Sequence, residues 1–158
     1  MIYQQTALPF GPAIVDADGD LLRADVDALV NAVNCVGVMG KGIALQFKQR
    51  FPEAFTAYRN ACNAGEVRPG RVFAHPTKGQ WILHVPTKRH WRDQARLDDV
   101  QAGVQDLARR ITQLRIASVA VPALGCGLGG LRWEDVRPLI VSALEPTGAR
   151  MLLYGPRP

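Results

Sequence analysis

The sequence has few of the features that mark membrane, secreted and metal-binding proteins. Its 158 residues include only three cysteines, Cys35, Cys62 and Cys126. Because they form no CxxC pair and an odd number cannot pair completely, we expect reduced thiols and a cytoplasmic location. No apolar run approaches the length of a membrane span, and the N-terminus lacks the pattern of a signal peptide. His75, His84 and His90 have no metal-ligand spacing, so we expect no metal or other cofactor.

Several common catalytic and nucleotide-binding motifs are also missing. The run Gly37-Val-Met-Gly40-Lys41-Gly42 is too short for a triphosphate P-loop and has glycine where Ser or Thr would hold magnesium. The GxGxxG dinucleotide motif fails at the first strand turn, where only Gly19 is present. No pair of carboxylates lies beside the glycines, which argues against two-carboxylate glycosidase chemistry.

The composition is that of a globular protein with a basic surplus. A hydrophobic content of 47% and a charged content of 21% fit one folded domain, which we expect to span residues 1–158. Lys and Arg number 19 against 14 Asp and Glu, giving a net charge of +5. This surplus favours a polyanionic partner, although many basic proteins bind no nucleic acid.

Apolar patterning alternates between strands and helices along the chain. The patterns predict strands at 13–17, 28–33, 71–74, 81–85, 116–121 and 151–154. They predict helices at 41–51, 52–64, 97–114 and 133–144, with Pro138 in the first turn of the last helix or kinking it. This alternation indicates a three-layer α/β/α sandwich with a central mixed, largely parallel sheet.

A first glycine-rich loop follows the strand predicted at 28–33. Asn31 lies in that strand, Asn34 lies at its end, and Gly37-Val-Met-Gly40-Lys41-Gly42-Ile43 comes next. Residues three apart in a strand face opposite sides, so we expect Asn31 to satisfy backbone groups and Asn34 to reach ligand hydroxyls. The helix predicted after the loop would offer free N–H groups to a phosphate or a polyol.

A second glycine-rich loop, Pro122-Ala-Leu-Gly125-Cys-Gly127-Leu-Gly129-Gly130, follows the strand predicted at 116–121. One such loop alone would usually be a tight turn. Two of them in one small domain indicate a long, anionic, ribose-bearing ligand. Cys126 has no histidine placed by the sequence to activate it, so we interpret it as a small apolar loop residue.

The segment Thr87-Lys88-Arg89-His90-Trp91-Arg92 joins three cations to an aromatic residue at a strand end. It is either a solvated basic loop or a contact for a single nucleic acid strand, with cations on phosphates and Trp91 stacked on a base. Lys88 is either a phosphate contact, which the residues alone favour, or a nucleophile.

Taken together, these segments resemble the macrodomain family, the ADP-ribose-binding fold. The matching elements are Gly19–Leu22, Ala28–Asn34, Gly40–Ala44 and Val121–Leu128, in the family's order and over nearly the whole chain. Within the family, Met39–Lys48 and Pro86–Arg92 resemble the DarG branch of DNA ADP-ribosyl glycohydrolase antitoxins. The eukaryotic terminal ADP-ribose protein glycohydrolases form the related branch.

The resemblance implies a role for each matched position. Asp20 and the backbone of Leu21 would meet the adenine, the loop from Pro122 would wrap the pyrophosphate, and Tyr154 would pack on the adenosine. Asn34 and the turn that begins at Gly40 would hold the distal ribose. The implied ADP-ribose contacts are Asp20, Leu21, Asn34, Gly40, Lys41, Gly42, Ile43, Ala44, Pro122, Ala123, Leu124, Gly125, Cys126, Gly127, Leu128, Gly129 and Tyr154.

Lys88 matches the catalytic lysine of this branch, which attacks the anomeric carbon of the distal ribose and forms a lysyl-ADP-ribose intermediate that water resolves. The implied substrate is ADP-ribose on thymine of single-stranded DNA, with Arg89, His90, Trp91 and Arg92 as DNA contacts. The eukaryotic branch has an aspartate that helps release the product, at the position of Gly129 here. That difference leaves no obvious acid or base and puts more of the chemistry on Lys88.

The resemblance also implies a partner and leaves other functions open. The partner would be a cognate DarT-type toxin, bound mainly through a C-terminal domain that this chain lacks, so the chain is either a piece of a longer protein or a standalone, monomeric relative. The main alternative is a macrodomain that binds ADP-ribose without cleaving it. Others are a hydrolase of ADP-ribosylated protein carboxylates or of ADP-ribose 1″-phosphate, and a plain nucleic-acid-binding domain.

Overall fold

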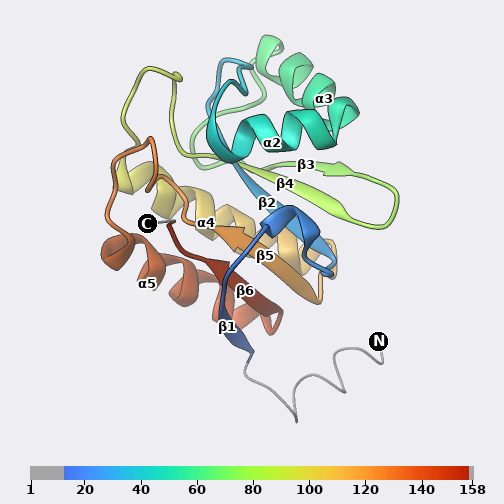
Figure 1. Ribbon diagram of the computed structural model, residues 1–158, viewed down its shortest axis with the longest axis vertical. Coiled ribbons are helices and arrows are strands. Elements are labelled where there is room, and N and C mark those ends of the chain that lie inside the picture. The colour runs from blue at the N-terminus through green and yellow to red at the C-terminus, as the bar shows by residue number, and fades with distance from the viewer. Residues whose placement is uncertain (1–12, 157–158) are drawn as a thin grey trace.

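A six-stranded sheet lies between two layers of helices in the computed structural model of the chain, which describes residues 13–156 (Figure 1). The strands are β1 (Ile14–Ala17), β2 (Ala28–Val33), β3 (Phe73–Pro76), β4 (Trp81–Pro86), β5 (Ser118–Pro122) and β6 (Arg150–Tyr154). The helices are α2 (Gly42–Arg50), α3 (Pro52–Asn63), α4 (Leu97–Gln113) and α5 (Trp133–Leu144), with short 3-10 helices η1 (Leu21–Arg23) and η2 (Glu145–Thr147).

The strand order is β1-β6-β5-β2-β4-β3, and every neighbouring pair is parallel except β3 and β4. The predicted three-layer α/β/α architecture with a mixed, largely parallel sheet is therefore confirmed. Because five strands run the same way, their carboxyl ends share one edge of the sheet. That edge is where open α/β sheets bind ligands.

Alternate residues of the central strands fill two separate apolar layers. In β2, Ala28 and Val30 pack with residues of α4 and α5, whereas Leu29 packs with η1 and with Phe47 of α2. The buried apolar side chains Val100, Val104, Leu107 and Ile111 are spaced three or four residues apart, so they lie on one face of α4. None of the helices within residues 13–156 is long and apolar enough to cross a membrane.

The structure confirms each predicted strand and helix, and the bounds of β2 and α5 agree with the prediction. Three strands start later than predicted, β1 by one residue and β3 and β5 by two. β3 begins at Phe73 because the N–H of Arg71 is bonded within a turn, and β5 begins at Ser118 because the N–H of Ile116 still bonds to the end of α4. Pro138 lies inside α5 and not in its first turn.

His84 is a fully buried polar residue in the middle of β4. Its ring stacks on Phe73 with centroids 5.9 Å apart, and its Nδ1 lies 3.2 Å from the side-chain nitrogen of Asn31. Burial, with a smaller contribution from the charge of His75, lowers the pKa of His84 to about 3. The folded protein therefore keeps this imidazole neutral.

We predict that His84 makes stability depend on pH between about pH 6.5 and about pH 3. The unfolded chain takes up a proton near pH 6.5, while folded His84 stays neutral until about pH 3, so the free energy of unfolding falls as the pH falls. This one residue contributes a slope of up to ~1.4 kcal/mol per pH unit. Urea unfolding between pH 7 and pH 5 should give a smaller slope for His84→Gln, and equal slopes would contradict the prediction.

Candidate functional site

Asn34 organises the first glycine loop (residues 34–41), which follows β2. Its Oδ1 accepts hydrogen bonds from the N–H groups of Val36 (3.0 Å) and Val38 (3.4 Å) and from the hydroxyl of Tyr58 (2.8 Å), while its Nδ2 donates to the carbonyl of Val38 (2.8 Å). These contacts occupy the amide oxygen and leave one N–H of Nδ2 for a ligand. That Asn34 binds ligand hydroxyls stays a prediction, now limited to this N–H.

Tyr58 of α3 supports Asn34 from inside the core. Its side chain is fully buried, and its hydroxyl lies 2.8 Å from both the main-chain oxygen and the Oδ1 of Asn34. Burial raises the pKa of Tyr58 above its ordinary value, so the hydroxyl keeps its proton and donates it. The sequence analysis does not single out Tyr58, which lies within the helix predicted at 52–64. The signal available there was that a buried tyrosine hydroxyl normally needs a partner.

Asn31 differs from its expected role. Its Nδ2 lies 3.2 Å from Nδ1 of His84 and 3.9 Å from the sulfur of Met39, and its Oδ1 has no partner among the described residues. The expectation that it satisfies backbone groups is therefore wrong. It also lies on the same side of the sheet as Asn34, because the strand ends at Val33 and its alternation does not extend to residue 34.

The second glycine loop (residues 122–130) is a series of tight turns held by its own backbone. The N–H of Cys126 donates to Ala123 (3.0 Å), and the N–H of Leu131 donates to Gly125 (2.9 Å). A Cβ at Gly129 would lie 2.4 Å from the carbonyl oxygen of Gly125 and 2.9 Å from the Cβ of Ala95. Since 2.4 Å is far below a real contact with backbone, this loop conformation excludes any side chain at position 129.

The loop between β4 and α4 (residues 87–96) is joined to both glycine loops by main-chain hydrogen bonds. The N–H groups of Thr87 and Lys88 donate to Val33 at 2.9 and 3.4 Å, and the N–H of Cys35 donates to Arg89 at 3.3 Å. At the other end of this loop, the N–H of Ala95 donates to Gly129 at 2.9 Å. The three loops predicted to form the site are therefore brought together.

Lys88 lies partly exposed in this loop, and its Nζ donates to the carbonyl of Trp91 at 3.2 Å. The guanidinium carbon of Arg92 lies 4.7 Å from the ring centroid of Trp91, and the ring centroids of Trp91 and His90 are 5.2 Å apart. Nδ1 of His90 accepts the N–H of Arg92, so Nε2 carries the proton of the neutral ring. Three neighbouring side chains thus present an aromatic face, a cation and an N–H donor at the surface.

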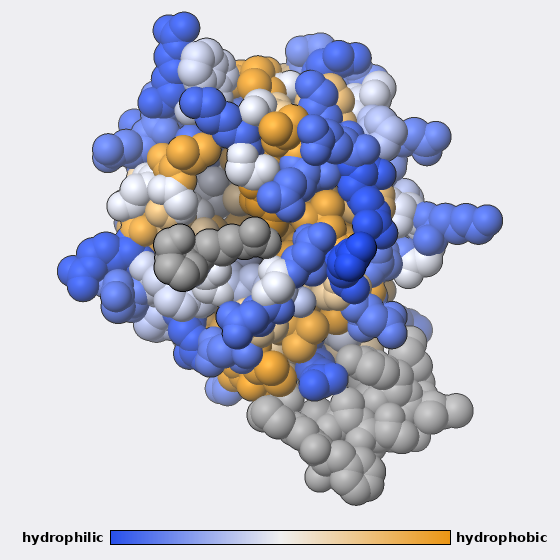
Figure 2. All heavy atoms as spheres, in the orientation of Figure 1, coloured by the Kyte–Doolittle hydropathy of each residue, from blue (hydrophilic) through white to orange (hydrophobic). Residues whose placement is uncertain are grey.

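Exposed apolar side chains also concentrate on these loops. Among the described residues, the large hydrophobic side chains that are exposed are Val36, Val38, Trp91, Leu97 and Leu128. Four of the five belong to the two glycine loops and the β4–α4 loop, and Leu97 begins the helix that follows. On the face drawn in Figure 2, hydrophobic residues are exposed in small areas among hydrophilic ones. Leu128 lies 3.9 Å from the position that a Cβ on Gly42 would take, so the second glycine loop faces the start of α2.

The residues implied to bind adenosine lie together at the other end of the same edge. Tyr154 ends β6, where it pairs in register with Pro122 of β5 and with Ala17 of β1. Tyr154 packs against the apolar cluster that contains Leu21 and Leu22, and burial, with a smaller contribution from the charge of Asp20, raises its pKa. The carboxylate of Asp20 accepts the N–H of Leu22 at 3.1 Å and caps η1.

Neither a thiol nor a metal cluster adds obvious chemistry. Burial raises the pKa of Cys35 and of Cys126 to about 11, with a smaller contribution from Cys62 at Cys35 and from Glu134 at Cys126. Both thiols are therefore poor nucleophiles, which agrees with the interpretation of Cys126 as a loop residue. Within residues 13–156, no group of His, Cys, Asp or Glu side chains is arranged to bind a metal.

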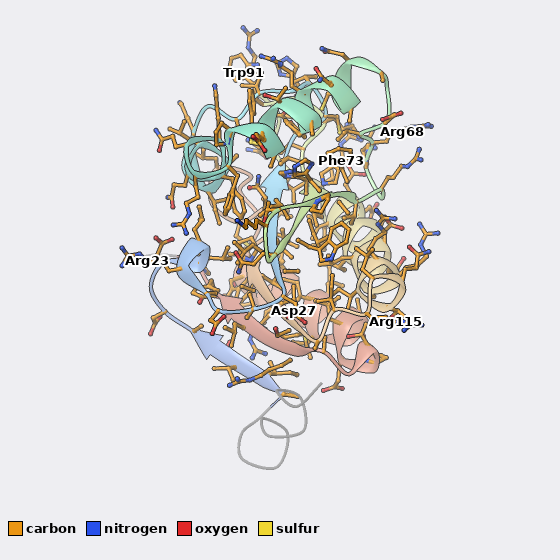
Figure 3. The ribbon with its side chains drawn as sticks, turned by 90° about the vertical axis from the view of Figure 1, so that its right-hand side faces the viewer. Arg23, Asp27, Arg68, Phe73, Trp91 and Arg115 are labelled. Atoms are coloured by element: carbon orange, nitrogen blue, oxygen red, sulfur yellow. The ribbon has the colours of Figure 1, made fainter. Side chains whose placement is uncertain are left out.

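A cavity of about 560 Å³ lies away from the glycine loops, at the amino ends of β2, β4 and β5, and its lining includes Arg23, Asp27, Lys78 and Ser118. Figure 3 shows Asp27 well below Trp91, which marks the β4–α4 loop. None of the residues predicted to form the site lines this cavity, although Leu22, which follows Leu21, does. We therefore place the candidate site at the carboxyl edge of the sheet.

Comparison with known proteins assigns the chain to a family. The Macro domain family matches residues 30–140. The DNA ADP-ribosyl glycohydrolase of Mycobacterium tuberculosis is 58% identical over 137 residues, which cover 84% of this chain and 39% of the relative. That of Thermus aquaticus is 48% identical and covers 87% of this chain and 40% of the relative. The chain thus spans about two fifths of the length of the curated relatives it matches.

Solved structures give the same assignment. The macrodomain of Mycobacterium tuberculosis DarG superposes with a TM-score of 0.88 and 54% identity, over 91% of this chain and 98% of that chain. Thermosipho africanus DarTG in complex with ADP-ribose superposes with a TM-score of 0.83 and 34% identity, over 87% of this chain and 40% of that chain.

We predict that Tyr58→Phe loosens the first glycine loop while leaving the fold intact. Loss of the hydroxyl removes one of the three donors to Oδ1 of Asn34 and costs about 1 kcal/mol of stability. Amide exchange at Val36 and Val38, followed by NMR, should become faster. Ser118→Ala is the control, because it removes another buried hydroxyl, which accepts from Asp27 far from this loop. Unchanged exchange at both valines in Tyr58→Phe would contradict this role.

We also predict that Gly129→Ala is destabilising whereas Gly127→Ala is tolerated. The new Cβ at position 129 forces the backbone of Gly125 to move, at a cost of about 1–3 kcal/mol, while a Cβ at position 127 has no atom within 4 Å. Urea unfolding of the two variants checks the difference. Similar stabilities for the two would show that the second loop adapts freely.

Proposed function

The chain belongs to the macrodomain family, in its DarG branch, and on that premise we propose that it removes ADP-ribose from thymine bases of single-stranded DNA. It would thereby reverse the modification made by a DarT-type toxin. The observation that carries the proposal is the position of Lys88, which lies in a loop hydrogen-bonded to both glycine loops. An ADP-ribose that lies along the two glycine loops would bring its distal ribose to this loop.

We assign the ligand contacts as the sequence analysis did. The second glycine loop and the start of α2 offer N–H groups to the pyrophosphate and the distal ribose, since α2 has no side-chain cap on its first turn. Asp20 would contact the adenine, and Tyr154 would pack on the adenosine. Arg89, His90, Trp91 and Arg92 would contact the DNA strand, with a base stacked on the indole of Trp91 and phosphates on the guanidinium groups.

The proposed reaction has two steps. The lone pair of the Lys88 amine attacks the anomeric carbon of the distal ribose, the glycosidic bond to thymine breaks, and the base leaves with the proton that the amine gives up. Water then cleaves the bond between this carbon and Nζ, which releases ADP-ribose and restores the amine. The carbonyl of Trp91, which accepts from Nζ at 3.2 Å, fixes the starting position of the amine.

The close packing at Gly129 supports a mechanism without a carboxylate at that position. An aspartate there would require the backbone of the second loop to move, because its Cβ would overlap the carbonyl of Gly125. The aspartate of the eukaryotic branch therefore has no equivalent that a simple side-chain substitution could restore. This supports a covalent step on Lys88 and counts against a protein-carboxylate substrate.

We further propose a cytoplasmic monomer that works beside a cognate toxin. Cys35, Cys62 and Cys126 are all unpaired, as in a reducing compartment. Thermosipho africanus has a fusion of DNA ADP-ribosyl transferase and DNA ADP-ribosyl glycohydrolase, which is 32% identical to this chain over 158 residues. That arrangement supports a toxin partner here.

The proposal predicts that Lys88→Ala abolishes release of ADP-ribose from a thymine-modified single-stranded oligonucleotide. Binding of free ADP-ribose, measured by calorimetry, should change by less than about tenfold, because the glycine loops supply most contacts. The lysyl glycosylamine can open its ribose ring to an imine, which borohydride should reduce to a stable adduct on the Lys88 peptide of the wild type, detectable by mass spectrometry. Release by Lys88→Ala at the wild-type rate would reject the nucleophile. Binding without release by the wild type would instead identify a reader of ADP-ribose.

A further inference from the structure

Arg89, the residue after Lys88, forms a two-point ion pair with Asp99 in the first turn of α4. Its Nε lies 3.2 Å from Oδ2 and its Nη2 lies 3.2 Å from Oδ1 of the carboxylate. The Asp99 side chain is only 11% exposed, against 52% for that of Arg89. A carboxylate anchored on a rigid helix therefore holds a side chain that extends from the β4–α4 loop.

The main chain around Lys88 is held from the opposite side by the first glycine loop. The carbonyl of Arg89 accepts the N–H of Cys35 at 3.3 Å, and the carbonyl of Lys88 accepts its thiol at 3.5 Å. The N–H of Lys88 donates to Val33. Residues 88 and 89 are thus fixed between β2 and α4, and the Asp99–Arg89 pair supplies the α4 side of that attachment.

We propose that Asp99 is a positioning residue for the reaction, which acts through Arg89 to set the direction from which Lys88 approaches the ribose. The inference rests on the proposed function and alters one part of it, because Arg89 becomes a structural partner and not a phosphate contact. Two of its donors are already given to a carboxylate, whose charge offsets that of the guanidinium. Arg92 differs, since it stacks on Trp91 and forms no ion pair among residues 13–156.

Two conservative variants separate positioning from phosphate binding. Arg89→Lys keeps the charge that a phosphate would need but loses the planar fork that fits Asp99. Asp99→Asn keeps the charge of Arg89 and removes that of its partner. If the pair positions Lys88, each variant lowers kcat for oligonucleotide release by about tenfold to a hundredfold, with KM within about threefold of the wild type. The double variant should lose no more than either single variant.

Two further variants serve as comparisons. Asp16→Asn breaks a similar two-point pair with Arg137, at 3.0 and 2.9 Å, between β1 and α5, and should leave kcat unchanged. Arg92→Ala should instead raise KM. It should also reduce the slope of the logarithm of the DNA-binding constant against the logarithm of the salt concentration by about one. A wild-type kcat in both Arg89→Lys and Asp99→Asn would overturn the proposal. So would a raised KM in Arg89→Lys together with a wild-type Asp99→Asn, because that result identifies a phosphate contact.

Limited trypsin digestion tests the same attachment without any substrate. The loop contains the cleavage sites Lys88, Arg89 and Arg92. Asp99→Asn should speed cleavage in this loop relative to the wild type and to Asp16→Asn. This readout keeps its meaning if the chain fails to release ADP-ribose from DNA, in which case the proposed function fails and the attachment stands. Equal cleavage rates in all three proteins would show that Asp99 does not hold the loop.

Discussion

The backbone hydrogen bonds of the β4–α4 loop are the constraint on which the candidate site depends. One end of this loop bonds to Val33 and Cys35, and the other end bonds to Gly129. The three segments are far apart in the chain, and only the sheet order places their strands side by side. Because these bonds join main chain to main chain, they fix the relative position of the loops whatever side chains occupy them. These backbone hydrogen bonds therefore determine where Lys88 lies in the candidate site.

The fold and the outline of the site could be predicted from local patterns. The apolar run at 28–33 and the heptad-like repeat of α4 each reflect burial on a known face, and burial is what such patterns record. The placement of Lys88 and the glycine loops followed from the rule that ligands lie at the carboxyl ends of parallel strands. The apolar pattern of a strand does not show where the preceding turn ends. The predicted starts of β3 and β5 were therefore two residues too early.

What could not be predicted were the partners of polar side chains. Asn34 was expected to point at a ligand, yet most of its amide binds its own loop and Tyr58. Arg89 was grouped with the exposed cations, and its pairing with Asp99 depends on how α4 approaches the loop across ten residues of sequence. Such partners are set by tertiary packing, and neither residue type nor spacing within the chain specifies them.

The buried pair of Asn31 and His84 favours the observed register between β2 and β4. Polar groups in the centre of a sheet are costly, and here Oδ1 of Asn31 and Nε2 of His84 have no partner among the described residues. The two are direct neighbours in the β2–β4 ladder, as are Val33 and Pro86. A slip of one residue would bury each polar group against an apolar face and would move Thr87 and Lys88 away from Val33. The pair therefore disfavours misaligned sheets in which Lys88 would lie outside the candidate site, and its cost in stability is offset by the correct alignment of the β4–α4 loop.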